Sequence, residues 1–471
     1  MGNWLPLEVL LDVAECLKED RGSLVQCTRV CVRWKAVFER LLYRKMDVRS
    51  NDLDTSIGDL SLARFEVLTS AAGISRRPFI KHLVYHIVLP YDLGVWSNQT
   101  PDYQASGEEN SFRKANDDVF TMAITDLFAV LSSFENTQFS LAFELVGCQE
   151  PLEPEMEEAS LDWREEEQTT LPYQARLPST ELLKLPDIRS ISKLLFSDDF
   201  LGSTGIWSGT AFQIAHCYST LQSLEFDLAA HEDSEFKRER RKALTQGIKE
   251  LPLTLKVFHY SELYSSFMEK EEKAVDLLLG ETDMLALTMR EFSLQLRELK
   301  LIGIAISSDF IWPLDQMGKP ASSTTEVFWP HLEIIEVGPP PYLPTGEYLC
   351  EVSPDYPPTI KPEPFHRFCI AMGFAARSMP RLTSIEYCAR FEDDHFNRFN
   401  FSHYVSERTG ITKGVLRWIS TWRPEGCSAK YVPDERVKNA WGWSEDTEVF
   451  ESSVLRRQIL WKLPCWPPAS W

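Results

Sequence analysis

Apolar residues recur along most of the chain in short clusters that favour strands. In seven clusters they occupy positions i, i+3 and i+5, so the last two residues of each cluster share one face of an extended segment. The seven triplets are Ile80/Leu83/Tyr85, Ile191/Leu194/Phe196, Leu221/Leu224/Phe226, Leu255/Phe258/Tyr260, Leu296/Leu299/Leu301, Leu332/Ile335/Val337 and Leu382/Ile385/Tyr387. The pattern predicts a series of short strands with one buried face.

Runs with helical character lie between these strands, and the strand-then-helix alternation recurs every ~30 to 50 residues. The runs are Asp118 to Phe134, Thr210 to Tyr218, Ser234 to Leu251, Glu271 to Thr288 and Glu363 to Ser378. One strand–helix unit cannot bury its own apolar face, so such units are stable only when stacked on their neighbours. The chain is therefore predicted to be an α/β protein, with an irregular solenoid of short parallel strands and helices. An unrelated α/β domain is the alternative.

The first fifty residues have a different pattern, which predicts three short amphipathic helices. Val9, Val13 and Leu17 repeat at helical spacing in the first, and Ser23 is placed to cap the second. In the third helix, Val30, Trp34, Val37, Phe38 and Leu41 follow the spacing i, i+4, i+7, i+8 and i+11. A module this small has little core of its own. We therefore expect an apolar face that another polypeptide covers.

The same segment resembles the F-box, through Leu5-Pro6-Leu7-Glu8 at its start and Val30-Cys31-Val32-Arg33-Trp34 near its end. The resemblance implies a three-helix module that docks on a Skp-type adaptor and, through it, on a cullin. It implies that the side chains on or near the adaptor surface are Leu5, Pro6, Glu8, Val9, Leu10, Val13 and Leu24. It places Val30, Trp34 and Val37 in the core of the module. The alternative is an ordinary helical cap on the following domain.

Two domains are expected: an F-box at residues 1–48 and an irregular leucine-rich-repeat-like domain at 49–471. The longer part resembles large fungal F-box proteins, although the Asn or Cys that regular repeats place after each strand is missing. An acidic insertion is expected at 146–170, since residues 150–167 contain nine acidic residues and one Arg. Such a charge run is more often a solvated segment than a docking strip for a basic partner.

Charge and cysteine usage narrow the possible partners. The 471 residues have a formal net charge of −21 and a pI near 5.0, which disfavours binding to nucleic acid. The ten cysteines are scattered without a C-x-x-C pair, which predicts reduced thiols inside the cell. No stretch is long and apolar enough to predict a membrane span. A cytoplasmic or nuclear protein is expected.

Candidate chemistry is sparse. The basic run 237–242 suits either a nuclear import signal or a solvated helix that points Phe236, Leu244 and Ile248 inward. His82 and His86 lack the glutamate of a zinc-protease helix, and strand alternation places them on one face, so metal binding is not predicted.

An aromatic stretch at 391–404 forms either a pocket or an ordinary packed loop. It contains Phe391, Phe396, Phe399, Phe401 and Tyr404, together with His395, His403, Arg398, Asp393 and Asp394. No nucleophile elbow, phosphate loop or dinucleotide fingerprint is present. No catalytic residue, metal or cofactor is therefore assigned.

These features predict the substrate-recognition subunit of a cullin-based SCF-type ubiquitin ligase. The F-box would bind the adaptor, and the repeat domain would hold a target protein, so that this subunit contributes positioning rather than catalysis. The acidic balance of the chain favours a basic or neutral target. One alternative is a scaffold that uses the F-box outside ubiquitination, and a more distant one is a hydrolase or transferase in the 391–404 region.

Overall fold

The computed structural model describes most of the chain in two compact units, Met1–Glu225 and Phe226–Trp471, and each unit is treated by itself. The described residues are 5–52, 60–93, 111–134, 137–149, 173–179, 183–198, 204–230, 233–263, 275–278, 280, 282–321, 328–340, 342–353, 356–392, 395–405, 412–420, 433–443, 448–452 and 457–463.

The first unit begins with three helices: α1 (Leu7–Cys16), α2 (Arg21–Thr28) and α3 (Val32–Leu42). Their number and order are those predicted. The cap of α2 differs from the prediction, because Asp20 rather than Ser23 precedes the helix. The Asp20 carboxylate accepts a hydrogen bond from the Ser23 backbone N–H at 3.0 Å. An acceptor three residues ahead of an unpaired N–H is the usual capping geometry, so Ser23 lies inside the first turn.

A parallel sheet follows in the same unit, with strand order β2-β1-β3-β4-β6. Its strands are β1 (Lys45–Arg49), β2 (Leu60–Ser61), β3 (His82–Tyr91), β4 (Phe139–Gln149) and β6 (Ile191–Ser197). The helices are α4 (Leu62–Thr69), the 3₁₀ helix η1 (Ala71–Phe79), α6 (Ser111–Leu131) and α7 (Ser208–His216). Strands β5 (Tyr173–Ala175) and β7 (Thr204–Ile206) form a separate parallel pair.

The second unit continues the strand–helix alternation and then changes to hairpins. Strands β9 (Val257–Leu263), β10 (Glu298–Ile302), β11 (Ile334–Gly338) and β14 (Ser384–Glu392) pair in parallel. Strands β15 (His395–Val405), β16 (Thr412–Ser420), β18 (Arg457–Leu463) and β17 (Glu448–Ser452) add antiparallel pairs after β14. Strand β8 (Ser223–Ala229) crosses the boundary between the units, and β12 (Cys350–Ser353) pairs with β13 (Tyr356–Ile360). The helices are α8 (Ser234–Ile248), α9 (Met284–Ser293), η3 (Ser308–Phe310), α10 (Pro362–Arg377) and α11 (Glu435–Trp441).

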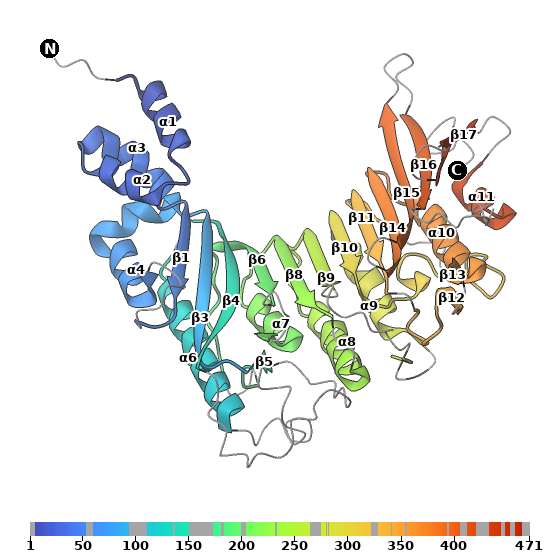
Figure 1. Cartoon of the computed structure of the whole chain (residues 1–471), viewed down its shortest axis with the longest axis horizontal. Helices are drawn as coiled ribbons and strands as arrows, with labels where there is room; N and C mark the ends of the chain where they lie inside the picture. Colours follow the sequence, from blue (N-terminus) through green and yellow to red (C-terminus); the bar gives the residue numbers. More distant parts are fainter. Residues whose placement is uncertain are drawn as a thin grey trace. The chain divides into compact units, whose positions relative to one another are not determined.

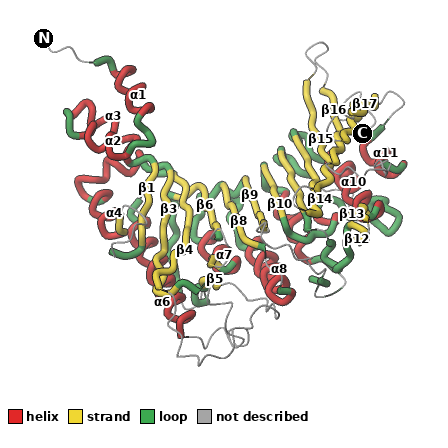
Figure 2. Tube along the Cα trace, in the orientation of Figure 1, coloured by secondary structure: helices red, strands yellow, loops and turns green. Residues whose placement is uncertain are grey.

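Helices cover one face of the strands in each unit (Figures 1 and 2). Aromatic side chains pack between the strands and these helices. In the first unit the Tyr85 hydroxyl of β3 donates to the Ala123 carbonyl of α6 at 3.1 Å. In the second unit Phe258 of β9 meets Phe292 of α9, with ring centroids 5.3 Å apart. In the part of the chain that the structure describes, no helix lies on the other face of the strands (Figures 1 and 2), which carries charged residues such as Glu298, Lys300 and Glu336.

The expectation of N-terminal helices followed by mixed α/β structure with a parallel sheet is confirmed. Three details differ from the prediction. The last strands of the chain are antiparallel, and residues 146–149 of the expected acidic insertion belong to β4. The helix expected at 271–288 begins only at Met284, because the Asp283 side chain caps it by accepting from the Ala286 N–H at 3.0 Å. Residues 150–170 of the insertion lie outside the described residues.

Candidate docking surface

Helix α1 is apolar around most of its circumference. Its acidic residues Glu8, Asp12 and Glu15 follow the spacing i, i+4 and i+7, so they form one narrow stripe on the helix. Apolar side chains occupy the rest of the circumference. A helix of this kind is normally buried on nearly all sides.

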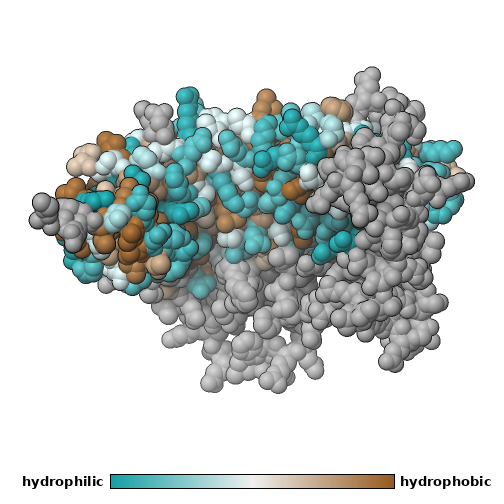
Figure 3. Space-filling model, turned by 90° about the horizontal axis from the view of Figure 1, so that it is seen from above, coloured by the Kyte–Doolittle hydropathy of each residue, from teal (hydrophilic) through white to brown (hydrophobic). Residues whose placement is uncertain are grey.

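Only a small part of this apolar surface is covered within the chain. Leu10 and Ala14 are the buried residues of α1. By contrast, Leu5, Leu7, Val9 and Leu11 are 45%, 46%, 40% and 48% exposed. Figure 3 shows hydrophobic side chains gathered at the N-terminal end of the first unit, where Figure 1 places these helices.

Two further apolar residues are exposed at the start of α3. Val30 is 60% exposed and Val32 is 85% exposed. Val32 is the first residue of the helix, after Cys31 in extended backbone. Together with Leu5, Leu7, Val9 and Leu11 we call these residues the α1 docking face, although they lie on more than one side of the helices. Six exposed, large apolar side chains on one three-helix module are typical of a surface that binds another protein.

The three helices have a core of their own beneath this face. Leu10, Ala14, Leu24, Val37 and Phe38 form one buried cluster, and partly buried residues including Trp34 pack against it. The Trp34 and Phe38 rings stack with centroids 5.2 Å apart. The docking face therefore rests on a folded module and is not a by-product of loose packing.

Helix α3 attaches this module to the rest of the first unit through η1. The Arg76 guanidinium lies 3.2 Å from the Glu39 carboxylate and over the Tyr43 ring, 5.3 Å from its centroid. Arg40 in turn lies over the Phe79 ring at 5.7 Å. The attachment uses the end of α3 that lies away from Val32, so the docking face stays uncovered.

Residues 3–49 match the family model described as F-box-like. This segment is an F-box-like domain. Comparisons with curated proteins and with solved structures found no match to it. The F-box match covers the three helices and β1, which is the region where the exposed docking face and the separate core occur together.

The predicted F-box residues divide between surface and core differently from what we expected. Leu5, Pro6, Glu8 and Val9 are exposed, and Val13 is partly buried. Leu10 and Leu24, expected at the adaptor surface, are only 1% and 2% exposed, because they fill the space between the helices. Val37 lies in the module's core, and Trp34 is partly buried and packs against it. Val30 does not lie in the core, since it follows the end of α2 and points outward.

Sequence reasoning missed Leu7, Leu11 and Val32 as surface residues. For Leu7 and Leu11, the signal that could have identified them is the stripe of Glu8, Asp12 and Glu15 on the same helix. It leaves Leu7 and Leu11 on one flank of the buried seam of α1 and Val9 on the other.

The helix-free face of the second unit carries a ladder of paired charges. Glu298 of β10 contacts His259 at 2.9 Å and Lys300 at 3.5 Å, and Lys300 also reaches Glu336 of β11 at 3.6 Å. Further along, Arg398 of β15 lies 3.0 Å from Glu386 of β14. Burial raises the pKa of Glu386, and the nearby Glu336 carboxylate adds to the increase. This face is polar, and its charges are paired along the strands.

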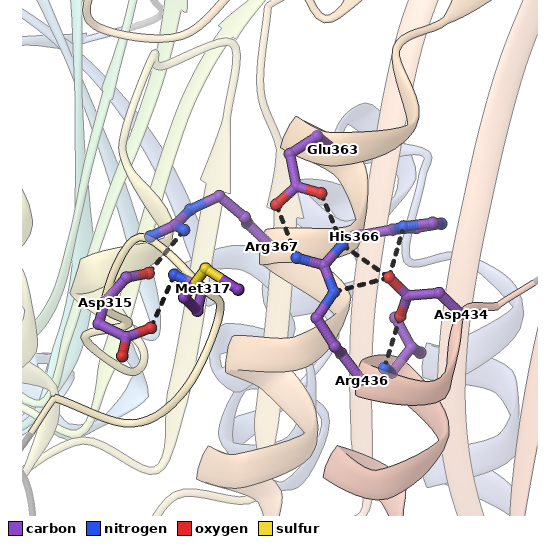
Figure 4. A network of polar contacts seen from close by, with 8 residues as sticks. Asp315, Met317, Glu363, His366, Arg367, Asp434 and Arg436 are labelled. Carbon is purple, nitrogen blue, oxygen red and sulfur yellow. Dashed lines mark hydrogen bonds and ion pairs between the residues drawn. The ribbon is translucent and has the colours of Figure 1, made fainter.

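A second polar network joins α10 to α11 (Figure 4). Arg436 donates to Glu363 of α10 at 2.9 Å and to Asp434 at 2.7 Å. Asp434 also caps α11 by accepting from the Val437 N–H at 2.9 Å, and it lies 3.3 Å from His366. Each of these groups is occupied in holding the two helices together, so the network has a structural role.

The two histidines of β3 lie on one face of the strand, as strand alternation predicted. His86 lies 3.1 Å from the Glu144 carboxylate, and His82 contacts the Ser140 hydroxyl at 2.7 Å. Within the described part of the chain, no group of three His, Cys, Asp or Glu side chains is arranged to hold a metal ion. None of the described helices is long and apolar enough to cross a membrane.

The basic run 237–242 lies in α8, and Phe236, Leu244 and Ile248 point inward as predicted. The expectation that its charges are solvated is only partly correct, because Arg240 and Arg241 are buried. Arg241 pairs with Asp283, which satisfies its charge inside the unit.

The aromatic stretch 391–404 is ordinary packing where its side chains are described. Phe399 and Phe401 of β15 are buried against Trp441, with ring centroids 5.7 Å and 5.0 Å away. Arg398 pairs with Glu386 on the opposite face of the strand. The side chains of Phe391, Phe396, His395, His403 and Tyr404, and both Asp393 and Asp394, lie outside what the structure describes.

Proposed function

We propose that this F-box protein is the substrate-recognition subunit of a cullin-based SCF-type ubiquitin ligase. The observation that carries the proposal is the α1 docking face, an uncovered apolar surface on a module with its own core. Because F-box domains typically bind Skp-type adaptors, such an adaptor is the proposed occupant of this face.

The proposed role of the remaining chain is to hold a target protein. Its strand–helix units are proposed to form an irregular leucine-rich-repeat-like solenoid, whose helix-free strand face offers paired charges to a partner. The chain would bring target lysines close to a conjugating enzyme by raising their effective concentration. Ubiquitin transfer would be catalysed by other subunits, so no catalytic residue is assigned to this one.

The adaptor interaction is tested by binding of the full-length chain to a purified Skp-type adaptor, measured by calorimetry. Leu5→Asp with Val9→Asp places two charges on the docking face, and we expect at least a tenfold loss of affinity. Leu253→Asp is the matched control, because Leu253 is 81% exposed in the second unit. Unchanged affinity in the double variant, or no binding by the wild type, would disprove adaptor docking on α1.

The ligase role needs a separate experiment, because a scaffold could use the same docking face. Wild-type chain should recover a cullin from a reconstituted mixture only when the adaptor is present, and the Leu5→Asp/Val9→Asp variant should not. Adaptor binding without cullin recovery would favour the scaffold.

A further inference from the structure

The second unit contains a cavity of about 450 Å³ along one side of α8. Four cationic side chains line it: Arg238, Arg241, Lys242 and Lys249. Arg238, Lys242 and Lys249 follow the spacing i, i+4 and i+11, so they form one stripe along the helix. The described residues that line the cavity include no acidic side chain.

Within the described part of the chain, three of the four cations form no ion pair with a carboxylate. Arg241 is 8% exposed and pairs with Asp283, while it also donates to the Ala305 carbonyl. Arg238 donates twice to the Asp276 backbone carbonyl, at 3.0 and 2.9 Å, and a carbonyl carries no net charge. Lys242 and Lys249 are exposed, and their side-chain ammonium groups have neither an ion pair nor a hydrogen bond with any described residue.

The opposite wall of the cavity is largely apolar. It is lined by Leu277 and Leu278, from the segment that leads into α9, and by Met284 and Leu285, from the first turn of α9. Leu277 and Leu285 are buried, whereas Met284 is 53% exposed. Cations beside an apolar wall attract an anion more strongly than they would in open water, because the local dielectric constant is lower.

This lining specifies a ligand with two chemically different parts. We propose that the cavity binds a small organic phosphate, whose phosphate contacts the cationic stripe and whose apolar body lies against Leu277 and Met284. Phosphate suits the stripe because its oxygens accept hydrogen bonds from several Lys and Arg donors at once. The volume lies within the range of about 300–1,000 Å³ that is usual for small-molecule sites.

The net charge of −21 does not prevent this binding. Charges more than about 8 Å from the site are largely screened at physiological salt, so the cations at the cavity dominate. The proposal is independent of the adaptor-docking proposal, because the cavity and the α1 docking face share no residue.

The test is calorimetric titration of the full-length chain with phenyl phosphate, phenol and pyrophosphate at constant ionic strength. Phenyl phosphate should bind more tightly than phenol, which lacks the charge. Lys242→Gln with Lys249→Gln should weaken phenyl phosphate binding at least tenfold, whereas Lys319→Gln, an exposed lysine of the same unit, should leave it unchanged. Met284→Gln should weaken phenyl phosphate but not pyrophosphate.

Several results would overturn the proposal. These are equal phenyl phosphate affinity in the wild type and the double lysine variant, or phenol binding as tight as phenyl phosphate binding. Binding of a phosphotyrosine peptide without binding of phenyl phosphate would assign the cavity to a protein ligand instead.

A folding control accompanies the double lysine variant. Because both lysines are exposed, this variant should unfold at the wild-type temperature, which would show that its loss of binding is not caused by a loss of folding. The Leu5→Asp/Val9→Asp variant should bind phenyl phosphate like the wild type.

Discussion

Helices α1 and α10 are both apolar over most of their surface, yet the chain covers only one of them. In α10, Phe365 and Phe368 pack on Tyr387 of β14, and Cys369 accepts a hydrogen bond from Trp441 of α11. In α1 only Leu10 and Ala14 are buried. An apolar helix in water is stable when something covers it. The comparison indicates that α10 is part of the unit's own core, whereas most of the apolar surface of α1 is left uncovered, as the proposed adaptor docking requires.

The largest expected loss of stability follows a substitution in α10, the helix that the chain covers. Phe368→Ala removes a ring that stacks on Tyr387 at 4.6 Å and leaves a cavity among residues that cannot all move. The cost should be about 3–5 kcal/mol of unfolding free energy, measured by urea denaturation. A loss below about 1 kcal/mol, typical of surface positions, would show that α10 is not buried as described.

A somewhat smaller loss is expected on the inner side of α1. Leu10→Ala should cost about 2–5 kcal/mol, because Leu10 fills the core of the F-box. The readout is faster hydrogen exchange in α1, α2 and α3. Leu11→Ala, next to it but 48% exposed, is the matched control and should leave exchange unchanged.

Lowering the pH from 7 to 5 should loosen α10 and α11 and leave α1 unaffected. Burial lowers the pKa of His366, and the hydrogen bond from Arg436 lowers the pKa of Glu363. A group whose folded pKa is lowered stabilises the fold above its unfolded pKa and loses that contribution as the pH falls through the folded value. Stability of this region should therefore fall below about pH 6.5, the reference value for His.

The measurement is hydrogen exchange of α10 and α11 between pH 7 and pH 5, corrected for the intrinsic pH dependence of exchange. His366→Gln should remove most of the change in this range, because Glu363 titrates at lower pH. The same slope in the variant would exclude His366 as the cause.

The smallest change in stability is expected for substitutions on the exposed side of α1. Leu7→Ser with Leu11→Ser should change the unfolding free energy by no more than about 0.5 kcal/mol per site, since both side chains already face water. Adaptor affinity should nevertheless fall. A large loss of stability here would mean that the chain itself covers α1, and the contrast with α10 would disappear.

The apolar triplets predicted the parallel strands well, because each marks a strand whose alternate residues are buried. Leu299 and Leu301 in β10, and Ile335 and Val337 in β11, are typical. Strand β4 was missed because the leading position, three residues before Phe139, is occupied by Asn136. Strand β1 has a triplet with the same spacing, Tyr43, Met46 and Val48, but it follows directly on the F-box helices.

The antiparallel strands and the fine structure of the F-box could not be predicted from spacing. In β15, Phe399 and Phe401 alternate with polar residues just as in a parallel strand, so direction depends on the short connections rather than on side-chain pattern. Leu10 and Leu24 are as apolar as Leu7 and Leu11, and only the packing of three helices decides which of them is covered.

The attachment of α3 to η1 has a consequence for geometry. Because Arg76 contacts both Glu39 and Tyr43, the F-box is held against the rest of the first unit and is not connected to it by a flexible linker alone. A ligase assembled on α1 would approach that unit from one constant direction. The angle of the attachment between α3 and η1, and not the length of a linker, would then decide which target lysines come close to the conjugating enzyme.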